Sequence, residues 1–211
     1  MTAAAAEQRV SGLYGLVTHA GFYEGFQNLL GAERARRIYF RDWARVPEGA
    51  EVLDVGCGPG VAIPHLRHGA YVGVDLNPPH VAAARARGFP RAEFHVGDAR
   101  EVAPRLGRSF DAVLCLGFLH HMSDAGVRLL MEALAERLRP GGAVLLLEPV
   151  RVPGQRWAAR RLMDADSGLH IRDEQGYRAL LERPGFRLES AIRHDLLRVP
   201  YDHFLGRLSR A

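Results

Sequence analysis

Short apolar runs alternate with segments of helical period along most of this chain. Runs of β-branched and aliphatic residues, each followed by a polar or glycine turn, predict strands that are buried on both faces. Five such strands are expected, at residues 52–55, 71–76, 94–98, 110–116 and 143–147. Helices are expected between them, at 61–67, at 79–87, near Val102 and at 125–138, and a turn at 139–142 ends the last helix. This alternation predicts an α/β fold with a doubly wound, mostly parallel sheet and helices on both faces.

The pattern changes before the first of these strands and after the fifth. Residues 11–44 have the spacing of amphipathic helices. After Pro149 the pattern loosens until residue 172, and it then predicts a helix near 173–182 and two last strands near 186–193 and 201–205. We therefore expect one domain over residues 1–211, with a helical lid at 1–47, a core at 48–150 and an added segment with the last strands at 151–211.

The composition agrees with a self-sufficient core. A chain of 211 residues that is 47% hydrophobic can bury enough apolar surface to fold without metals or disulfides. Cys57 and Cys115 fall at predicted strand ends, where small reduced residues fit better than a disulfide. No apolar run approaches the roughly 18 residues needed to span a bilayer, and the start of the chain lacks the form of a signal peptide. We expect a cytoplasmic protein.

The basic side of the composition is made of arginine alone. The chain carries 28 basic residues and no lysine, with a net charge of +4. Because the arginines are scattered along predicted helices, a solvated surface is favoured over a nucleic-acid site. The absence of lysine excludes Schiff-base chemistry and the Tyr-x-x-x-Lys pair of short-chain dehydrogenases.

The first predicted strand leads directly into a glycine turn. Residues 52–60 read V-L-D-V-G-C-G-P-G, and glycines at this place let the backbone turn tightly and approach a ligand without a Cβ. Loops that bind a dinucleotide pyrophosphate read G-x-G-x-x-G, whereas this turn reads G-x-G-x-G. Asp54, just ahead of it, would repel a pyrophosphate and attract an ammonium group.

This turn resembles the first motif of class I S-adenosylmethionine (SAM)-dependent methyltransferases, whose cofactor has an amino acid end in place of phosphates. The resemblance covers roughly residues 50–149, where five strand ends follow in the right order. It implies a seven-stranded Rossmann-like sheet and SAM as cofactor with S-adenosylhomocysteine as product. No metal is expected, because His65 and His68, spaced i and i+3 on a predicted helix, have no third ligand nearby in the sequence. A Rossmann-like sheet with some other ligand is the alternative.

The resemblance assigns parts of the cofactor to the strand ends. Asp54 suits the ammonium, and the backbone of the turn, with the start of the next helix, suits the carboxylate. Asp75 is placed to accept hydrogen bonds from both ribose hydroxyls. Asp98 lies by the adenine amino group in the resembled family, and its alternative role is that of a helix N-cap. The expected cofactor-binding residues are Asp54, Gly56, Cys57, Gly58, Gly60, Asp75, Leu76, Asp98, Ala99, Leu116 and Gly117, with Tyr14 and Gln27 from the lid.

Methyl transfer from a sulfonium is an in-line displacement, so alignment and a dry pocket contribute most of the catalysis. An oxygen or carbon nucleophile must also lose a proton. His120 and His121 follow the fourth strand and are the candidates for that base, with Tyr23 closing over the acceptor from the lid. The alternative is that both histidines are structural loop residues and that the lid aromatics form a packed stripe.

The sequence therefore predicts methyl transfer to an oxygen, nitrogen or carbon atom of a small metabolite. The expected partner is that small molecule, with no nucleic acid, no membrane and a monomer or homodimer. Two alternatives remain open: an RNA or protein methyltransferase, and a SAM-binding protein without methyl transfer activity. The segment after Pro149 resembles the tail of many bacterial class I methyltransferases, a resemblance that gives no acceptor.

Overall fold

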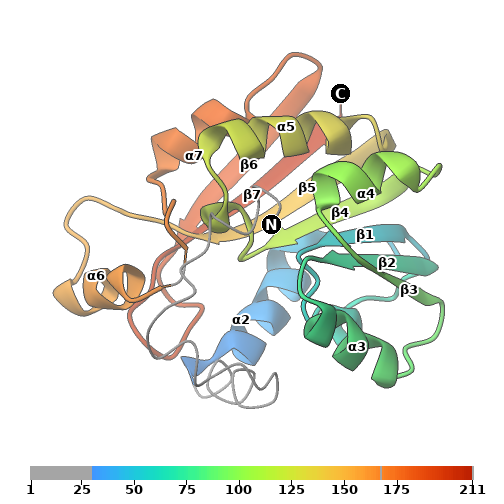
Figure 1. Cartoon of the computed structure of the whole chain (residues 1–211). Helices are drawn as coiled ribbons and strands as arrows, with labels where there is room; N and C mark the ends of the chain where they lie inside the picture. Colours follow the sequence, from blue (N-terminus) through green and yellow to red (C-terminus); the bar gives the residue numbers. More distant parts are fainter. Residues whose placement is uncertain (1–29, 167, 211) are drawn as a thin grey trace.

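A single sheet organises the chain. The computed structural model describes residues 30–166 and 168–210 (Figure 1). Seven strands lie in the order β3-β2-β1-β4-β5-β7-β6, and β7 is antiparallel to both of its neighbours while the other six strands share one direction. The strands are β1 Glu51–Val55, β2 Ala70–Asp75, β3 Ala92–Val96, β4 Phe110–Leu116, β5 Leu138–Pro149, β6 Phe186–Arg193 and β7 His203–Arg210. The predicted seven-stranded, mostly parallel sheet is confirmed.

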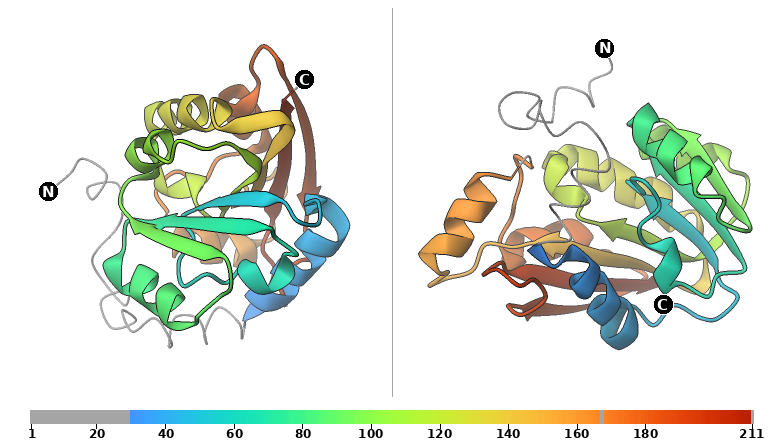
Figure 2. Two further views of the ribbon diagram at one scale, coloured as in Figure 1. Left: turned by 90° about the vertical axis from the view of Figure 1, so that its right-hand side faces the viewer. Right: turned by 90° about the horizontal axis from the view of Figure 1, so that it is seen from below.

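Helices cover both faces of the sheet, as predicted. On one face lie α4 (Ala99–Arg105), α5 (Asp124–Ala135) and α7 (Glu174–Leu181), whose apolar sides share one core cluster with Leu53 and Val113. On the other face, α2 (Ala32–Tyr39) and α3 (Pro78–Ala86) share a second cluster with Val52 and Leu114. Figures 1 and 2 show these two layers from three directions. Adjacent strand residues thus enter opposite cores, which is why the central strands are apolar throughout.

The helix predicted at 61–67 is wrong. The structure has only a short 3₁₀ helix there, Ile63–His65. Pro64 lacks an N–H and its ring would clash with the carbonyl of residue 60, which disfavours an α-helix that starts at Val61. Gly60, with a φ of 78°, also turns the chain away from helical geometry. The glycine turn is therefore not followed by an α-helix N-terminus, and the helix-dipole contribution expected for an anion falls away.

Other boundaries also differ from the predicted ones, among them the end of the third strand at Val96 instead of 98 and the end of the last strand at Arg210 instead of 205. The turn expected at 139–142 lies within β5, where Gly141 has a φ of 77° and the pairing with β4 shifts its register. The preceding helix ends at Ala135 instead of 138, and the last strand begins at His203 instead of 201. Helix α6 (Trp157–Asp164) was not predicted, because only Ala159 and Met163 of its eight residues are buried.

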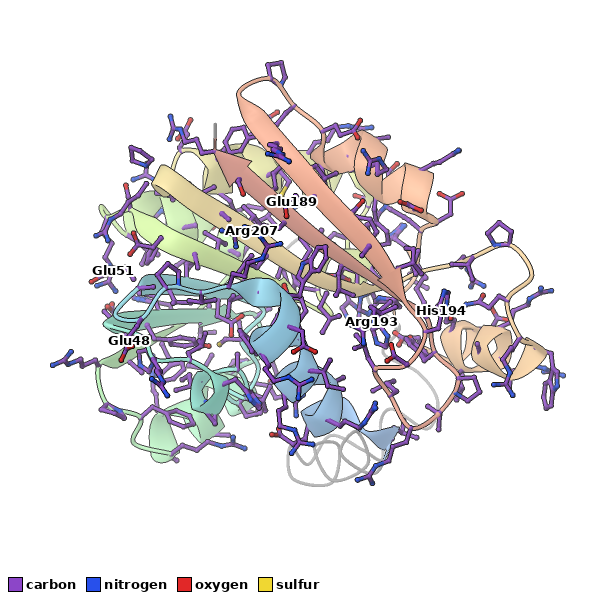
Figure 3. The ribbon with its side chains drawn as sticks, turned by 180° about the vertical axis from the view of Figure 1, so that it is seen from behind. Glu48, Glu51, Glu189, Arg193, His194 and Arg207 are labelled. Carbon is purple, nitrogen blue, oxygen red and sulfur yellow. The ribbon has the colours of Figure 1, made fainter. Side chains whose placement is uncertain are left out.

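The helical segment before β1 is hydrogen-bonded to β7 and to the loop that precedes it. Arg34 donates from Nη1 to the carbonyls of Asp195 and Leu196, at 2.6 and 2.7 Å. After α2 a π-helical turn, η3 (Phe40–Ala44), ends at a carbonyl that accepts from Arg207 of β7 at 2.9 Å. Figure 3 shows Arg207 beside Glu189 on this face of the sheet. The lid candidates Tyr14, Tyr23 and Gln27 lie outside the described residues.

Two findings concern the environment of the chain. Over the part that the structure describes, no helix is long and apolar enough to cross a membrane. Both cysteines, Cys57 and Cys115, are buried and unpaired, as expected from their places at strand ends. Burial raises the pKa of both thiols, so neither is a ready nucleophile.

Candidate active site

The glycine turn lies at the carboxyl edge of the sheet and rises directly from β1. Gly56, Gly58 and Gly60 have φ values of 73°, 52° and 78°, in the left-handed region that favours glycine. A Cβ on Gly56 would lie 2.3 Å from the Phe118 ring, whereas a Cβ on Gly58 would meet no described atom within 4 Å. The turn is therefore packed on the β4 side and open at Gly58, where a ligand can approach the backbone.

The hydrogen bonds of the turn correct one expectation. Gly56 and Cys57 both donate their N–H groups to the Val74 carbonyl, at 2.8 and 3.1 Å, and Gly58 donates to Asp75 Oδ2 at 2.8 Å. All three amides expected to hold the cofactor carboxylate thus have protein acceptors. Their role in this structure is to fix the turn against β2.

Asp75 ends β2 and holds the turn. Its Oδ2 accepts from Gly58 and its Oδ1 accepts from the backbone N–H of Asn77 at 2.8 Å. Each carboxylate oxygen has a second lone pair, so Asp75 can still accept from ribose hydroxyls. The next residue, Leu76, is 42% exposed, which leaves an apolar side chain free at this edge for an adenine ring.

Asp98 caps the N-terminus of α4, the role that the sequence analysis gave as the alternative to an adenine contact. Its Oδ1 accepts from the backbone N–H of Arg100 at 2.9 Å, at the first turn of α4. The Arg100 guanidinium also donates to both Asp98 oxygens. Burial acts to raise the pKa of Asp98, but the hydrogen bonds and charge of Arg100 outweigh it and hold that pKa below its ordinary value. Ala99, the expected adenine contact, is buried as the first residue of this helix.

Asp54 is buried beneath the turn. It is 3% exposed and accepts a hydrogen bond of 2.6 Å from the Tyr71 hydroxyl. Burial raises the pKa of Asp54 to about 7, although the Tyr71 hydrogen bond acts in the opposite direction. Its carboxyl group therefore changes charge near neutral pH, and a nearby ammonium group would favour the ionised form.

Glu148, near the end of β5, organises the loop after β4 and was missed by the sequence analysis. It is fully buried. Its Oε1 accepts from the backbone N–H groups of Phe118 and Leu119, both at 2.8 Å, and its Oε2 lies 2.7 Å from His120 Nδ1. A single glutamate inside the apolar run L-L-L-E-P-V was the available signal, because an unpaired charge is rarely buried there.

His120 is held between two carboxylates. Its second ring nitrogen, Nε2, lies 3.4 Å from Asp166 Oδ1. Burial acts to lower the pKa of His120, but its hydrogen bonds to Asp166 and Glu148 outweigh it and raise that pKa to about 9. For Asp166, burial acts to raise the pKa, but the hydrogen bond to His120 outweighs it and lowers that pKa to about 2. At neutral pH His120 is an imidazolium with both nitrogens engaged, so it has no lone pair for a proton.

The segment after α6 is closely packed on His120. A Cβ on Gly168 would lie 2.0 Å from the His120 ring, and His170 donates its N–H to the His120 carbonyl at 3.0 Å. Arg172 also binds this loop, since it donates to the carbonyls of Leu119 and Met122, at 3.1 and 2.7 Å. Residues 119–122 are thus fixed by partners about fifty residues away in the sequence.

His121 has a different environment from its neighbour. The two rings lie 4.0 Å apart, and among the described residues no group bonds to His121 Nδ1. Burial, together with the charge of His120, lowers the pKa of His121 to about 4. Of the two predicted histidines, His121 is therefore the neutral one at pH 7 and has a lone pair that can accept a proton.

Two cavities of moderate size lie at opposite edges of the sheet. One, of about 120 Å³, is at the amino ends of β4 and β5 beside Arg45 and Arg207, away from every predicted site residue. The other, of about 270 Å³, adjoins the network that His120 forms with Glu148 and Asp166, here called the His120 network. Its lining residues are Arg151, Met163, Asp164, Asp166, Gly168 and Leu169. No three His, Cys, Asp or Glu side chains of residues 30–166 and 168–210 gather as metal ligands.

A second histidine–carboxylate pair lies at the same edge. His194, in the loop after β6, lies with Nδ1 2.6 Å from Asp202 Oδ1, and the other oxygen of Asp202 accepts from Gln155 Nε2 at 2.6 Å. Figure 3 shows His194 beside Arg193 near α6.

The strand order, the glycine turn and the acidic end of β2 together define the class I methyltransferase architecture. Residues 52–142 match the family model described as a methyltransferase domain. Residues 52–142 therefore make up a class I, SAM-dependent methyltransferase domain.

Curated relatives share this region of the chain. The ubiquinone biosynthesis O-methyltransferase of Xanthomonas axonopodis pv. citri is 34% identical over 135 residues, which are 62% of this chain and 56% of that protein. The dTDP-3-amino-3,4,6-trideoxy-alpha-D-glucopyranose N,N-dimethyltransferase of Streptomyces venezuelae is 35% identical over 142 residues, 63% of this chain and 57% of that protein. The chain thus spans little more than half the length of these relatives.

A solved structure supports the fold alone. The magnesium protoporphyrin IX methyltransferase of Synechocystis PCC 6803, solved with bound SAM, superposes with a TM-score of 0.57 at 20% sequence identity. The superposition covers 95% of this chain and 86% of that one.

Proposed function

We propose that this chain transfers a methyl group from SAM to a small-molecule acceptor. The observation that carries the proposal is the turn at Gly58, which leaves backbone open to a ligand at the carboxyl edge of a methyltransferase sheet. The two relatives support the acceptor class, because their names describe one O-methyltransferase and one N,N-dimethyltransferase of small metabolites. SAM supplies the activated methyl group, and the protein supplies alignment and a water-poor pocket.

The residues present fit the cofactor at several points. Asp75 has spare acceptor capacity for ribose hydroxyls, and Leu76 offers an exposed apolar side chain beside it. Asp54 has a carboxyl group that ionises near neutral pH, as a counter-ion for an ammonium group would. Leu116 and Gly117 lie at the carboxyl end of β4, beside β5. Gly117 donates its N–H there to the Leu147 carbonyl at 2.7 Å.

Within this function we assign proton removal to His121. It is neutral at pH 7 and its Nδ1 has no partner among the described residues, whereas His120 is a cation with two carboxylate partners. A group that accepts a proton needs a free lone pair, which neutral His121 has and cationic His120 lacks. His120 instead positions the loop that carries His121.

The proposed function is tested with radiolabelled SAM and a metabolite extract. Label in small products supports it, whereas label in protein or RNA, or tight SAM binding without any transfer, contradicts it. With the acceptor in hand, His121→Ala should lower kcat about 100-fold for an oxygen or carbon nucleophile and leave SAM affinity nearly unchanged. His68→Ala is the control, because His68 lies at the other end of β2 and should leave kcat unchanged. A normal kcat in His121→Ala would remove the assigned base.

A further inference from the structure

The cavity beside the His120 network has a distinct charge. Three ionised side chains form that network: the carboxylates of Glu148 and Asp166 and the imidazolium of His120 between them. Glu148 accepts from the backbone N–H groups of Phe118, Leu119 and His120, an arrangement of donors that suits a carboxylate. Two negative charges and one positive charge leave a net charge of −1.

The other two charged side chains that line this cavity are paired with each other. Arg151 Nη2 lies 2.9 Å from Asp164 Oδ1, so these two lining residues neutralise each other. Arg172, which reaches the same loop, pairs with Asp124 at 2.8 Å. Among the side chains that line the cavity, none therefore offsets the extra negative charge of the network, in a chain whose net charge is +4.

Asp166 presents this charge to the cavity. Its oxygens accept from Gly168 N–H at 2.8 Å, from the Tyr201 hydroxyl at 3.0 Å and from His120. A carboxylate has about four acceptor positions, so one remains open. The side chain is 27% exposed, and it lines the 270 Å³ cavity together with the apolar side chains of Met163 and Leu169.

We propose that this cavity binds a cationic amino group of the methyl acceptor, with Asp166 as its counter-ion. The proposal rests on the proposed function, since it names the acceptor class of that same site. An ammonium donates up to three hydrogen bonds and gains most from a fixed carboxylate in a partly dry site. Met163 and Leu169 contact the carbon atoms next to the amine.

The bound amine is a recognition group, called here the cationic handle, and not the atom that is methylated. A carboxylate partner stabilises the protonated form of an amine, and a protonated amine has no lone pair with which to attack a methyl group. The nucleophile is therefore a different group of the same molecule, which lies toward the loop of His120 and His121. Asp166 acts as a specificity residue that positions the acceptor.

The test uses labelled SAM and a metabolite extract separated by ion exchange at pH 7 into cationic, neutral and anionic pools. The wild-type protein should label products in the cationic pool, and acetylation of amines in that pool should abolish the labelling. With the cationic pool, Asp166→Asn should raise the acceptor KM about tenfold or more while SAM affinity stays unchanged. Asp42→Asn, which removes a carboxylate paired with Arg41 on the surface, is the matched control and should behave as wild type.

Further outcomes separate the two proposals. Label in the neutral or anionic pool, or an unchanged KM in a folded Asp166→Asn protein, overturns the cationic handle and leaves methyl transfer intact. SAM binding with no label in any pool overturns the proposed function itself, and the handle with it. If Asp166→Asn fails to fold, Tyr201→Phe keeps the charge and removes one hydrogen bond. It should retain the preference for the cationic pool, and loss of that preference overturns the proposal.

Discussion

The two halves of the carboxyl edge are built in different ways. On the proposed cofactor side, the turn, Asp54 and Asp75 lie within about twenty residues, and backbone conformation sets most of the geometry. On the proposed acceptor side, Glu148, His120, Asp166 and Tyr201 come from four segments and are joined by side-chain hydrogen bonds. The first half is local in sequence and the second is assembled only by the fold.

This difference has an energetic consequence. A left-handed glycine conformation is a local property of the chain, so the proposed cofactor side depends less on distant side chains than the proposed acceptor side does. A buried ionic network depends on every member, because loss of one leaves another charge buried without a partner. The acceptor side should therefore respond to substitution as a cooperative unit, with effects on stability as well as on activity.

The largest effect is expected from breaking the network at His120. His120→Leu leaves Glu148 fully buried without its imidazolium partner, and should lower the free energy of unfolding by about 3 to 5 kcal/mol. Chemical denaturation measures this directly. In the double variant with Glu148→Gln, the buried charge is gone, so part of the stability should return.

The pH dependence of stability distinguishes a charge effect from a packing effect in the same variant. Since the folded pKa of His120 is about 9, above its ordinary value of 6.5, its contribution is fully present below pH 6.5 and is lost as the pH rises through 9. The wild type should lose stability over this window more steeply than His120→Leu. Parallel curves for the two proteins would show that His120 is not held as a cation.

The next effect concerns the cofactor side and uses two glycines as a matched pair. Gly58 and Gly141 have φ values of 52° and 77°, and a Cβ on either would meet no described atom within 4 Å. Valine at either position imposes similar backbone strain, about 1 to 2 kcal/mol. Only Gly58 lies at the carboxyl edge, so Gly58→Val should weaken SAM binding about 100-fold or more, while Gly141→Val should bind SAM normally.

Isothermal titration with SAM measures both affinities, and thermal unfolding confirms that the strain is comparable. Equal SAM affinities in the two variants would mean that the cofactor lies elsewhere. A loss of binding in both would show that backbone strain, and not contact with the cofactor, is responsible.

The same contrast explains what the sequence could predict. The central strands and the glycine turn were predictable because a buried parallel strand and a G-x-G-x-G turn each leave a local pattern. The helix after the turn was not, since Pro64 overrides the apolar spacing around it. Glu148 and Asp166 lie 28 and 46 residues from His120, and no local pattern connects residues at such separations.

For the histidines, sequence reasoning identified candidates and not roles. His120 and His121 are adjacent residues of the same type. Their pKa values of about 9 and about 4 follow from burial and from the carboxylates that hydrogen-bond to His120 alone. Such differences come from tertiary contacts, which is why the choice between base and structural residue had to wait for the fold.

The smallest expected effect is a proton released when SAM binds, and it tests whether Asp54 faces the ammonium end. Asp54 has a folded pKa of about 7, above its ordinary value of 3.8, so the folded protein holds this proton more tightly and stability falls as the pH rises between these values. An ammonium near Asp54 favours the ionised form. At pH 7, where Asp54 is about half protonated, binding should release about 0.5 proton, and SAM affinity should weaken as the pH falls below 7.

Calorimetric titrations of SAM in phosphate and in Tris at pH 7 measure this release, because the two buffers differ in ionisation enthalpy. Asp54→Asn is the control and should show the same heat in both buffers after correction for dilution. Since Asp54 is 3% exposed and bonded to Tyr71, its ionisation can respond only to a charge that comes close to the turn. Identical proton release in the wild type and in Asp54→Asn would place the ammonium end away from β1, and Asp54 would then be a structural partner of Tyr71 alone.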